Sequence, residues 1–248
     1  SCAGGHGWDD VQWSGDSRQL AFVSTSRDHK QEWLRVADAA NGDVREVMTE
    51  KVATYYESGI GKVNWRVLWG SNEVLWYSER DNWGQMYLYD LSTGKLKNQI
   101  THGDGDVTQV LGVDEKARAL YFLAVGKEAG WDPYYAAYYR VNFDGTGMKL
   151  LTPEVANHTV TPSPDGRYFL DVWSTPVTPE RAVVRDRNGK TMVEVGREDI
   201  SKLRAAGWKP LMPIKVKARD GRTDLYGFLF RPTDFDPAKR YPVVDHIY

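Results

Sequence analysis

The stretch VQWSGDSRQLAFVST (11–25) contains one strand, a polar turn and a second strand. Its apolar side chains alternate through Leu20 and Phe22, which is the period of a strand with one buried face. The same arrangement returns three times, as VNWRVLWGSNEVLWYSE (63–79), TQVLGVDEKARALYFLA (108–124) and HTVTPSPDGRYFLDVWS (158–174). Successive units are roughly 45 to 55 residues apart, a spacing typical of propeller blades, as measured between Leu20, Leu75, Leu120 and Phe169.

Each unit has a second half, in which an aromatic-rich strand is followed by a glycine-containing turn and a more polar strand. These halves are WLRVADAANGDVREV (33–47), MYLYDLSTGKLKNQI (86–100), YYRVNFDGTGMKLL (138–151) and RAVVRDRNGKTMVEV (181–195). Stacked blades bury the faces that a single four-stranded sheet would leave exposed. The sequence therefore predicts an all-β fold, a β-propeller of about four blades within residues 1–196.

The pattern changes after Val195. The segment 197–212 contains helically spaced apolar residues and predicts a short connecting helix and linker. Two alternating strands follow around Asp220 and Gly221, and the apolar run YPVVDHIY (241–248) predicts a strand buried on both faces. Residues 213–248 are therefore expected to begin a second domain.

Composition excludes several classes of function. The 32 basic and 34 acidic residues give a formal net charge of −2, so no broad positive field favours nucleic acid as a partner. No apolar run approaches the roughly 20 residues of a membrane-spanning helix. Cys2 is the one cysteine, which excludes an internal disulfide framework and a cysteine-based zinc site.

Two segments and their order carry a resemblance to a known family. They are SERDNWGQMYLYD (78–90) and the tail from Lys209 to Tyr248, which reads KPLMPIKVKARDGRTDLYGFLFRPTDFDPAKRYPVVDHIY. With these segments the chain resembles the dipeptidyl peptidase IV branch of the prolyl oligopeptidase family of serine peptidases. The tail then matches the start of an α/β-hydrolase domain, and residues 1–196 match the C-terminal part of the propeller that precedes it.

The resemblance implies an eight-bladed propeller over a hydrolase domain whose Ser-Asp-His triad removes dipeptides from peptide N-termini. It implies a peptide substrate, no cofactor, and an extracytoplasmic location that is periplasmic, secreted or membrane-anchored. The expected partners within the parent protein are further blades and the rest of the hydrolase domain. The chain contains no G-x-S-x-G elbow, so we expect it to be inactive alone.

Four residues are candidates for the site. By the resemblance, Tyr248 donates its hydroxyl to the tetrahedral oxyanion of the intact enzyme, a role that needs a fixed neutral donor; the alternative is an aromatic side chain that packs at the end of a strand. The loop 55–64 matches one that faces the substrate cavity, which makes Glu57, Lys62 and Asn64 candidate peptide contacts. An ordinary solvated loop explains the same three residues.

Other patterns favour structural roles. Glu79 and Asp81 match no complete calcium loop, and the five histidines show no metal-binding spacing, so no metal is expected. The aromatic clusters around Trp65 to Trp76 and Tyr134 to Tyr139 predict packing between blades.

Two further hypotheses concern partners. Blades alone also suit a non-enzymatic interaction scaffold, since fold does not determine function. Blades at the open ends of a partial ring would expose apolar faces, which predicts a homo-oligomer. The alternative is a smaller closed ring of four blades, which would protect the same faces.

Overall fold

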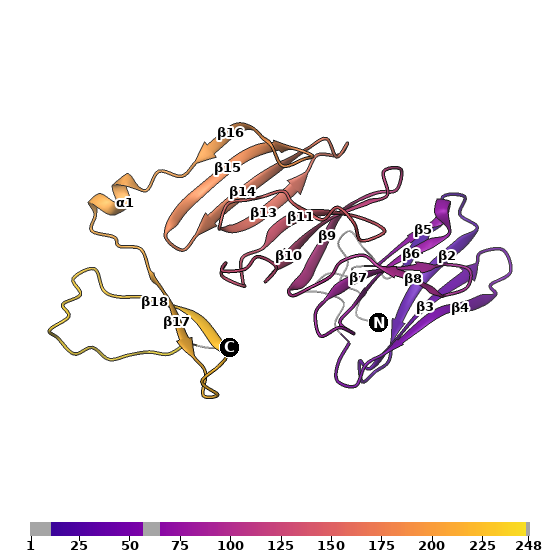
Figure 1. Cartoon of the computed structure of the whole chain (residues 1–248), viewed down its shortest axis with the longest axis horizontal. Coiled ribbons are helices and arrows are strands. Elements are labelled where there is room, and N and C mark those ends of the chain that lie inside the picture. Colours follow the sequence, from indigo (N-terminus) through magenta and orange to yellow (C-terminus); the bar gives the residue numbers. More distant parts are fainter. Residues whose placement is uncertain (1–10, 57–64, 247–248) are drawn as a thin grey trace.

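The structure is a computed structural model that describes residues 11–56 and 65–246. Four antiparallel sheets of four strands follow one another along the chain, and in each the strands lie side by side in sequence order. They stack next to one another from the N-terminal sheet at the right of Figure 1 to the fourth sheet at the upper left. The described chain thus has the predicted all-β blade architecture.

The strand bounds are as follows. Blade 1 contains β1 (Val11–Trp13), β2 (Gln19–Thr25), β3 (Gln31–Asp38) and β4 (Val44–Lys51). Blade 2 contains β5 (Arg66–Leu68), a 3₁₀ turn (Trp69–Ser71), β6 (Glu73–Ser78), β7 (Gln85–Asp90) and β8 (Leu96–Gln99). Blade 3 contains β9 (Asp106–Asp114), β10 (Ala119–Val125), β11 (Ala137–Asn142) and β12 (Lys149–Leu150). Blade 4 contains β13 (Asn157–Pro162), β14 (Tyr168–Thr175), β15 (Thr178–Asp186) and β16 (Thr191–Arg197).

The core lies between the blades, where the middle strands of blades 2 and 3 bury both faces. On β10, Leu120 and Phe122 pack with blade 2, whereas Ala119 and Tyr121 pack with blade 4. This division follows from the two-residue period of a strand, which sends successive side chains to opposite faces. Blade stacking therefore explains why these strands of blades 2 and 3 are apolar at most positions.

A glycine in the turn between the third and fourth strands sets the distance between neighbouring blades. Gly145 has φ +83°, and a Cβ there would lie 3.1 Å from the carbonyl oxygen of Gln99 in the preceding blade. Gly189 has φ +87°, and its Cβ would lie 2.5 Å from the carbonyl oxygen of Leu151. These turns need glycine for the left-handed backbone and for the close approach of the blade before them.

Most of the aromatic clusters pack as predicted. Trp65, Trp76, Tyr138 and Tyr139 are buried between blades. Tyr134 differs, since 73% of its side chain is exposed and its ring meets Tyr226 edge-on at 6.4 Å.

Beyond β16 the chain forms a short helix and one hairpin. Helix α1 (Ser201–Ala205) is followed by β17 (Met212–Lys217), which pairs with β18 (Asp224–Leu229). The strand expected at 241–248 is wrong for its described residues, because 241–246 are not in a strand, and Val243 and Val244 are 84% and 90% exposed. A strand buried on both faces needs packed layers above and below it, and no described segment supplies them. Among the described residues, no helix is long and apolar enough to cross a membrane.

Candidate functional site

The four site residues expected from the sequence, Tyr248, Glu57, Lys62 and Asn64, lie outside the described residues. The structure therefore tests none of them directly. It does describe the residues on either side of the 57–64 segment, the buried polar groups of the blades, and the cavities between their first strands.

A buried acidic cluster lies where blade 1 meets blade 2. Glu32 and Glu50 are direct cross-strand partners on β3 and β4, and each is at least nine-tenths buried. Glu50 accepts hydrogen bonds from Trp76 Nε1 at 2.7 Å, from Arg80 Nη2 at 2.8 Å and from the Ser78 hydroxyl. Like charges opposite each other are unfavourable in a sheet, and the Arg80 guanidinium offsets part of this repulsion.

Tyr56 completes this cluster. Its hydroxyl donates to the carbonyl oxygen of Tyr77 at 2.9 Å, across the interface between blades 1 and 2. Burial, together with the charges of Glu32 and Glu50, raises the pKa of Tyr56 well above its ordinary value, so the phenol stays neutral. Tyr56 is thus a fixed, neutral anchor immediately before the segment in which peptide contacts were expected.

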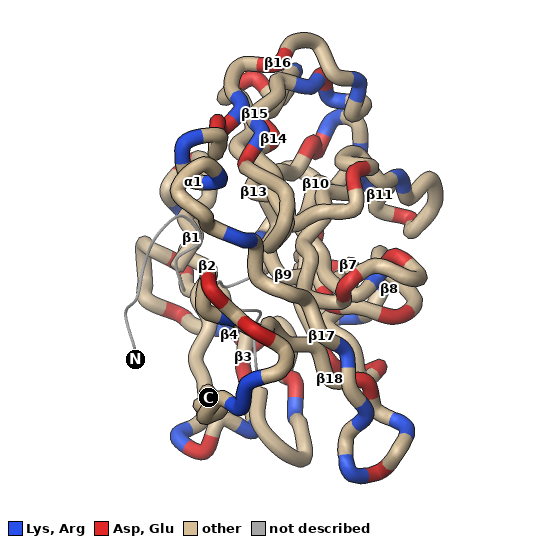
Figure 2. Tube along the Cα trace, turned by 90° about the vertical axis from the view of Figure 1, so that its left-hand side faces the viewer, with Lys and Arg blue, Asp and Glu red and all other residues tan. Residues whose placement is uncertain are grey.

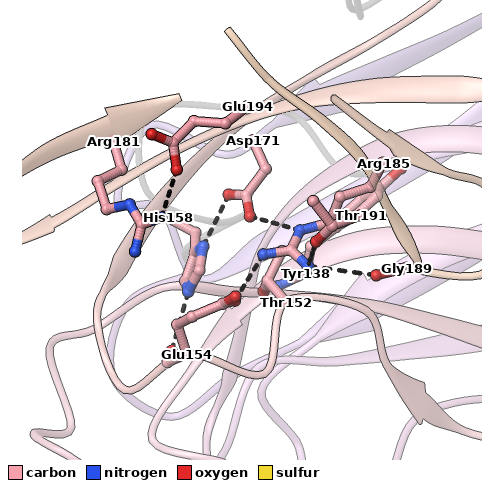
Figure 3. A network of polar contacts seen from close by, with 10 residues as sticks. All are labelled: Tyr138, Thr152, Glu154, His158, Asp171, Arg181, Arg185, Gly189, Thr191 and Glu194. Carbon is pink, nitrogen blue, oxygen red and sulfur yellow. Dashed lines mark hydrogen bonds and ion pairs between the residues drawn. The ribbon is translucent and has the colours of Figure 1, made fainter. Parts of the chain in front are cut away.

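A second polar network lies on the face of blade 4 that packs against blade 3 (Figure 3). Asp171 Oδ1 is 2.7 Å from His158 Nδ1, and Asp171 Oδ2 accepts from Arg185 Nε at 2.8 Å. Arg185 also donates to Glu154 Oε2 at 2.6 Å and to the Thr191 hydroxyl at 2.8 Å. Side chains from four strands and one loop therefore meet in one hydrogen-bonded group.

This network is structural, although a histidine next to an aspartate suggests a catalytic pair. His158 Nε2 is 3.0 Å from the backbone carbonyl oxygen of Glu154, an acceptor, so this nitrogen must donate and cannot take a proton from a substrate. The side chains of His158 and Asp171 are also fully buried. Sequence reasoning missed the network, although His158, Asp171 and Arg185 occupy inward positions of three successive predicted strands.

In the segment 78–83, Asp81 takes part in the hydrogen bonds of a turn. Asp81 Oδ2 accepts from the Tyr87 hydroxyl at 2.7 Å and from Gln99 Nε2 at 2.8 Å. Burial and this hydrogen bond from Tyr87 raise the pKa of the Tyr87 phenol. Within residues 11–56 and 65–246, no group of three or more His, Cys, Asp or Glu side chains could hold a metal ion.

Two adjoining cavities, each of about 530 Å³, lie along the first strands of the blades. The first is lined by β1, β5 and β9, and the second by β9, β10, the β13–β14 turn and Arg187. Both include Leu111, Gly112 and Glu115 in their walls, so β9 and its turn separate them. Of the described parts, these cavities offer room for a ligand, whereas the two polar clusters are closed.

Comparison with known proteins agrees with this architecture. The model of the family described as the dipeptidyl peptidase IV (DPP IV) N-terminal region matches residues 4–180. Dipeptidyl peptidase 4 of Arthroderma otae is 28% identical over 196 residues, which are 75% of this chain and 23% of that protein. The probable dipeptidyl-aminopeptidase B of Ajellomyces dermatitidis is 31% identical over 161 residues, which are 60% of this chain and 16% of that protein.

Solved structures show the same fold. The crystal structure of dipeptidyl peptidase 4 from Porphyromonas gingivalis superposes with a TM-score of 0.77 at 21% identity, covering 94% of this chain and 32% of that one. A putative dipeptidyl aminopeptidase IV from Bacteroides ovatus gives the same TM-score at 24% identity and covers 35% of its chain. The present chain thus spans less than a quarter of these curated relatives and about a third of these solved chains.

Proposed function

Because the chain belongs to the family of the dipeptidyl peptidase IV N-terminal region, we propose that it is part of the substrate-admitting propeller of a serine-type dipeptidyl peptidase. In this role the blades hold and orient peptides, and a hydrolase domain removes dipeptides from their N-termini. The observation that carries the proposal is the likeness in fold over 94% of the chain, which includes more than the four blades.

The hairpin β17–β18 and the segment that ends at Tyr248 support this assignment. A propeller scaffold needs neither element, whereas in α/β-hydrolases an oxyanion donor follows the third strand of the sheet. We assign this donor role to Tyr248 and the peptide contacts to Glu57, Lys62 and Asn64. Tyr56, anchored between blades 1 and 2, would fix one end of the segment that holds these three residues.

We further propose that the 248-residue chain does not hydrolyse peptides itself and that its parent enzyme works outside the cytoplasm. The printed sequence contains no G-x-S-x-G elbow, and a serine nucleophile needs such a turn and a positioned base.

The test compares this chain with the longer protein. Both are treated with a fluorophosphonate probe and then with dipeptidyl amide substrates. We expect the longer protein to be labelled on one serine and to release dipeptides, and this chain to do neither. A longer protein without amidase activity, or a labelled serine in this chain, would contradict the proposal.

A further inference from the structure

The second cavity lies between blades 3 and 4 and has a wall of packed aromatic rings. Tyr121 on β10 and Tyr138 on β11 have ring centroids 6.3 Å apart, and Tyr138 meets Phe169 of β14 edge-on at 5.0 Å. Tyr168 also lines the cavity and is 43% exposed. Small-molecule sites are lined mostly by such apolar and aromatic side chains, so a flat apolar group can pack in this cavity.

Two buried phenols in this wall have protons that no described residue accepts. Tyr121 is 9% exposed and Tyr138 is 3% exposed, and the Tyr121 oxygen accepts from Arg187 Nη2 at 3.0 Å. Burial raises the pKa of the Tyr138 phenol, so this group stays protonated and can donate. Buried donors are normally hydrogen-bonded, so two unused donors at a cavity indicate a ligand that supplies acceptor oxygens.

Arg187 adds a cation with donors to spare. Its Nη2 donates to Asp114 Oδ2 at 2.9 Å and to the Tyr121 hydroxyl, and no described residue accepts from its Nε or Nη1. A guanidinium can donate two parallel N–H groups to the two oxygens of one carboxylate. A carboxylate at Arg187 would lie next to the Tyr121 phenol, because the guanidinium already contacts that hydroxyl.

The charges around the cavity fit a ligand with one negative charge. Three carboxylates line the cavity, and each is paired with an arginine: Asp114 with Arg187, Glu115 with Arg66, and Asp165 with Arg167. Lys116 also lines the cavity and has no ion-pair partner among the described residues, which leaves one positive charge over. Basic and acidic residues are interspersed along the described chain, so no wider field of one sign alters this balance (Figure 2). A phosphate ester, with nearly two negative charges, would exceed it.

We propose that the cavity between blades 3 and 4 binds a small aromatic carboxylate. The carboxylate accepts hydrogen bonds from Arg187 and from the phenols of Tyr121 and Tyr138, and the flat ring packs beside Phe169 and Tyr168. This inference does not rest on the proposed function, since none of the residues assigned to peptide contact or catalysis lines this cavity.

The test is small-molecule binding by the 248-residue chain, measured by ligand-observed NMR. The probe is 2-naphthoate, and 2-naphthamide is the neutral compound of matching shape. We expect 2-naphthoate to saturate the chain with a Kd on the order of 0.1–1 mM, as is typical of a ligand of this size. The amide should bind about 10-fold more weakly or worse, because it lacks the charge-assisted hydrogen bonds to Arg187.

Two tyrosine variants on the same strand locate the site. Tyr138→Phe keeps the ring and removes the hydroxyl, and it should weaken 2-naphthoate binding about 10-fold. Tyr139→Phe is the matched control, because Tyr139 lies on the opposite face of β11, where its hydroxyl donates to Glu128 Oε1 at 3.0 Å. It should bind 2-naphthoate like the wild type. Arg187→Gln should abolish the preference for 2-naphthoate over 2-naphthamide.

A folding check accompanies these variants. The Tyr138 hydroxyl has no partner among the described residues, so thermal unfolding of Tyr138→Phe should match that of the wild type. Unchanged 2-naphthoate affinity of Tyr138→Phe, or an equal loss in Tyr139→Phe, overturns the inference. Equal affinities for the acid and the amide, or no saturation below about 10 mM, overturn it as well. Dipeptide release by the longer protein, present or absent, tests the proposed function alone.

Discussion

Glu73 makes the stability of this chain depend on pH in a way that can be measured. Its side chain is 3% exposed at the start of β6, where it accepts hydrogen bonds from Lys97 on β8 and from both terminal nitrogens of Arg118. Arg118 belongs to the β9–β10 turn of the next blade, so this carboxylate joins blade 2 to blade 3. The perturbation is Glu73→Gln, which keeps the shape and removes the charge.

The magnitude follows from the pKa of Glu73. Burial disfavours the charged form, but hydrogen bonds from Arg118, Lys97 and Ser71 outweigh it and lower the pKa from 4.5 to about 2. That difference corresponds to about 3 kcal/mol of stability. The side chains of Lys97 and Arg118 are 43% and 44% exposed, so solvent screening reduces the effect to ~1–2 kcal/mol.

The sign is fixed by the direction of the shift. Since the folded pKa lies below the unfolded value, the stabilisation is fully present above pH 4.5 and is lost as pH falls toward 2. The glutamine variant cannot titrate at this position. It should therefore be ~1–2 kcal/mol less stable than the wild type at pH 7, and this difference should shrink steadily between pH 4.5 and 2.

The assay is urea unfolding of both proteins at a series of pH values, because the difference between them cancels all other titrating groups. Glu115→Gln is the control: its ion pair with Arg66 is long and open to solvent, so we expect less than about 0.5 kcal/mol at any pH. A difference between wild type and Glu73→Gln that is the same at pH 7 and pH 3 would refute the reasoning.

Three further predictions concern catalysis, the network of blade 4 and association. In the longer enzyme, Tyr248→Phe should lower kcat on the order of 10²-fold with little change in KM, as expected of an oxyanion donor. An unchanged kcat in amide hydrolysis would show that Tyr248 has only a packing role. Asp171→Asn removes the buried carboxylate that pairs with Arg185 Nε and should cost about 3 to 5 kcal/mol in urea unfolding. A loss below about 1 kcal/mol would show that the network is not stabilising. Leu170 and Val193 are 36% and 51% exposed on blade 4, so we expect the chain to form a homo-oligomer through this face. Sedimentation at micromolar concentration should show this oligomer, and Leu170→Lys should dissociate it. A wild-type monomer of 28.2 kDa would reject the association.

The sequence alone determined the blades, because the signals that define them are local. Alternation through Leu20 and Leu120 identifies strands with a buried face, and glycines such as Gly189 mark the turns that allow the next strand to pair back. Such patterns need only neighbouring residues, so four sheets of four strands could be predicted with their approximate bounds. The family resemblance followed from local segments too, and the family match agrees with it.

Only the tertiary structure decided which distant residues meet. The link between Glu73 and Arg118 and the cavity lined by β1, β5 and β9 join residues from different blades. The contact of His158 with Asp171 joins two strands of blade 4. The strand expected at 241–248 failed for the same physical reason. An apolar run shows that a segment can be buried, but burial on two faces depends on neighbours that the run itself does not encode.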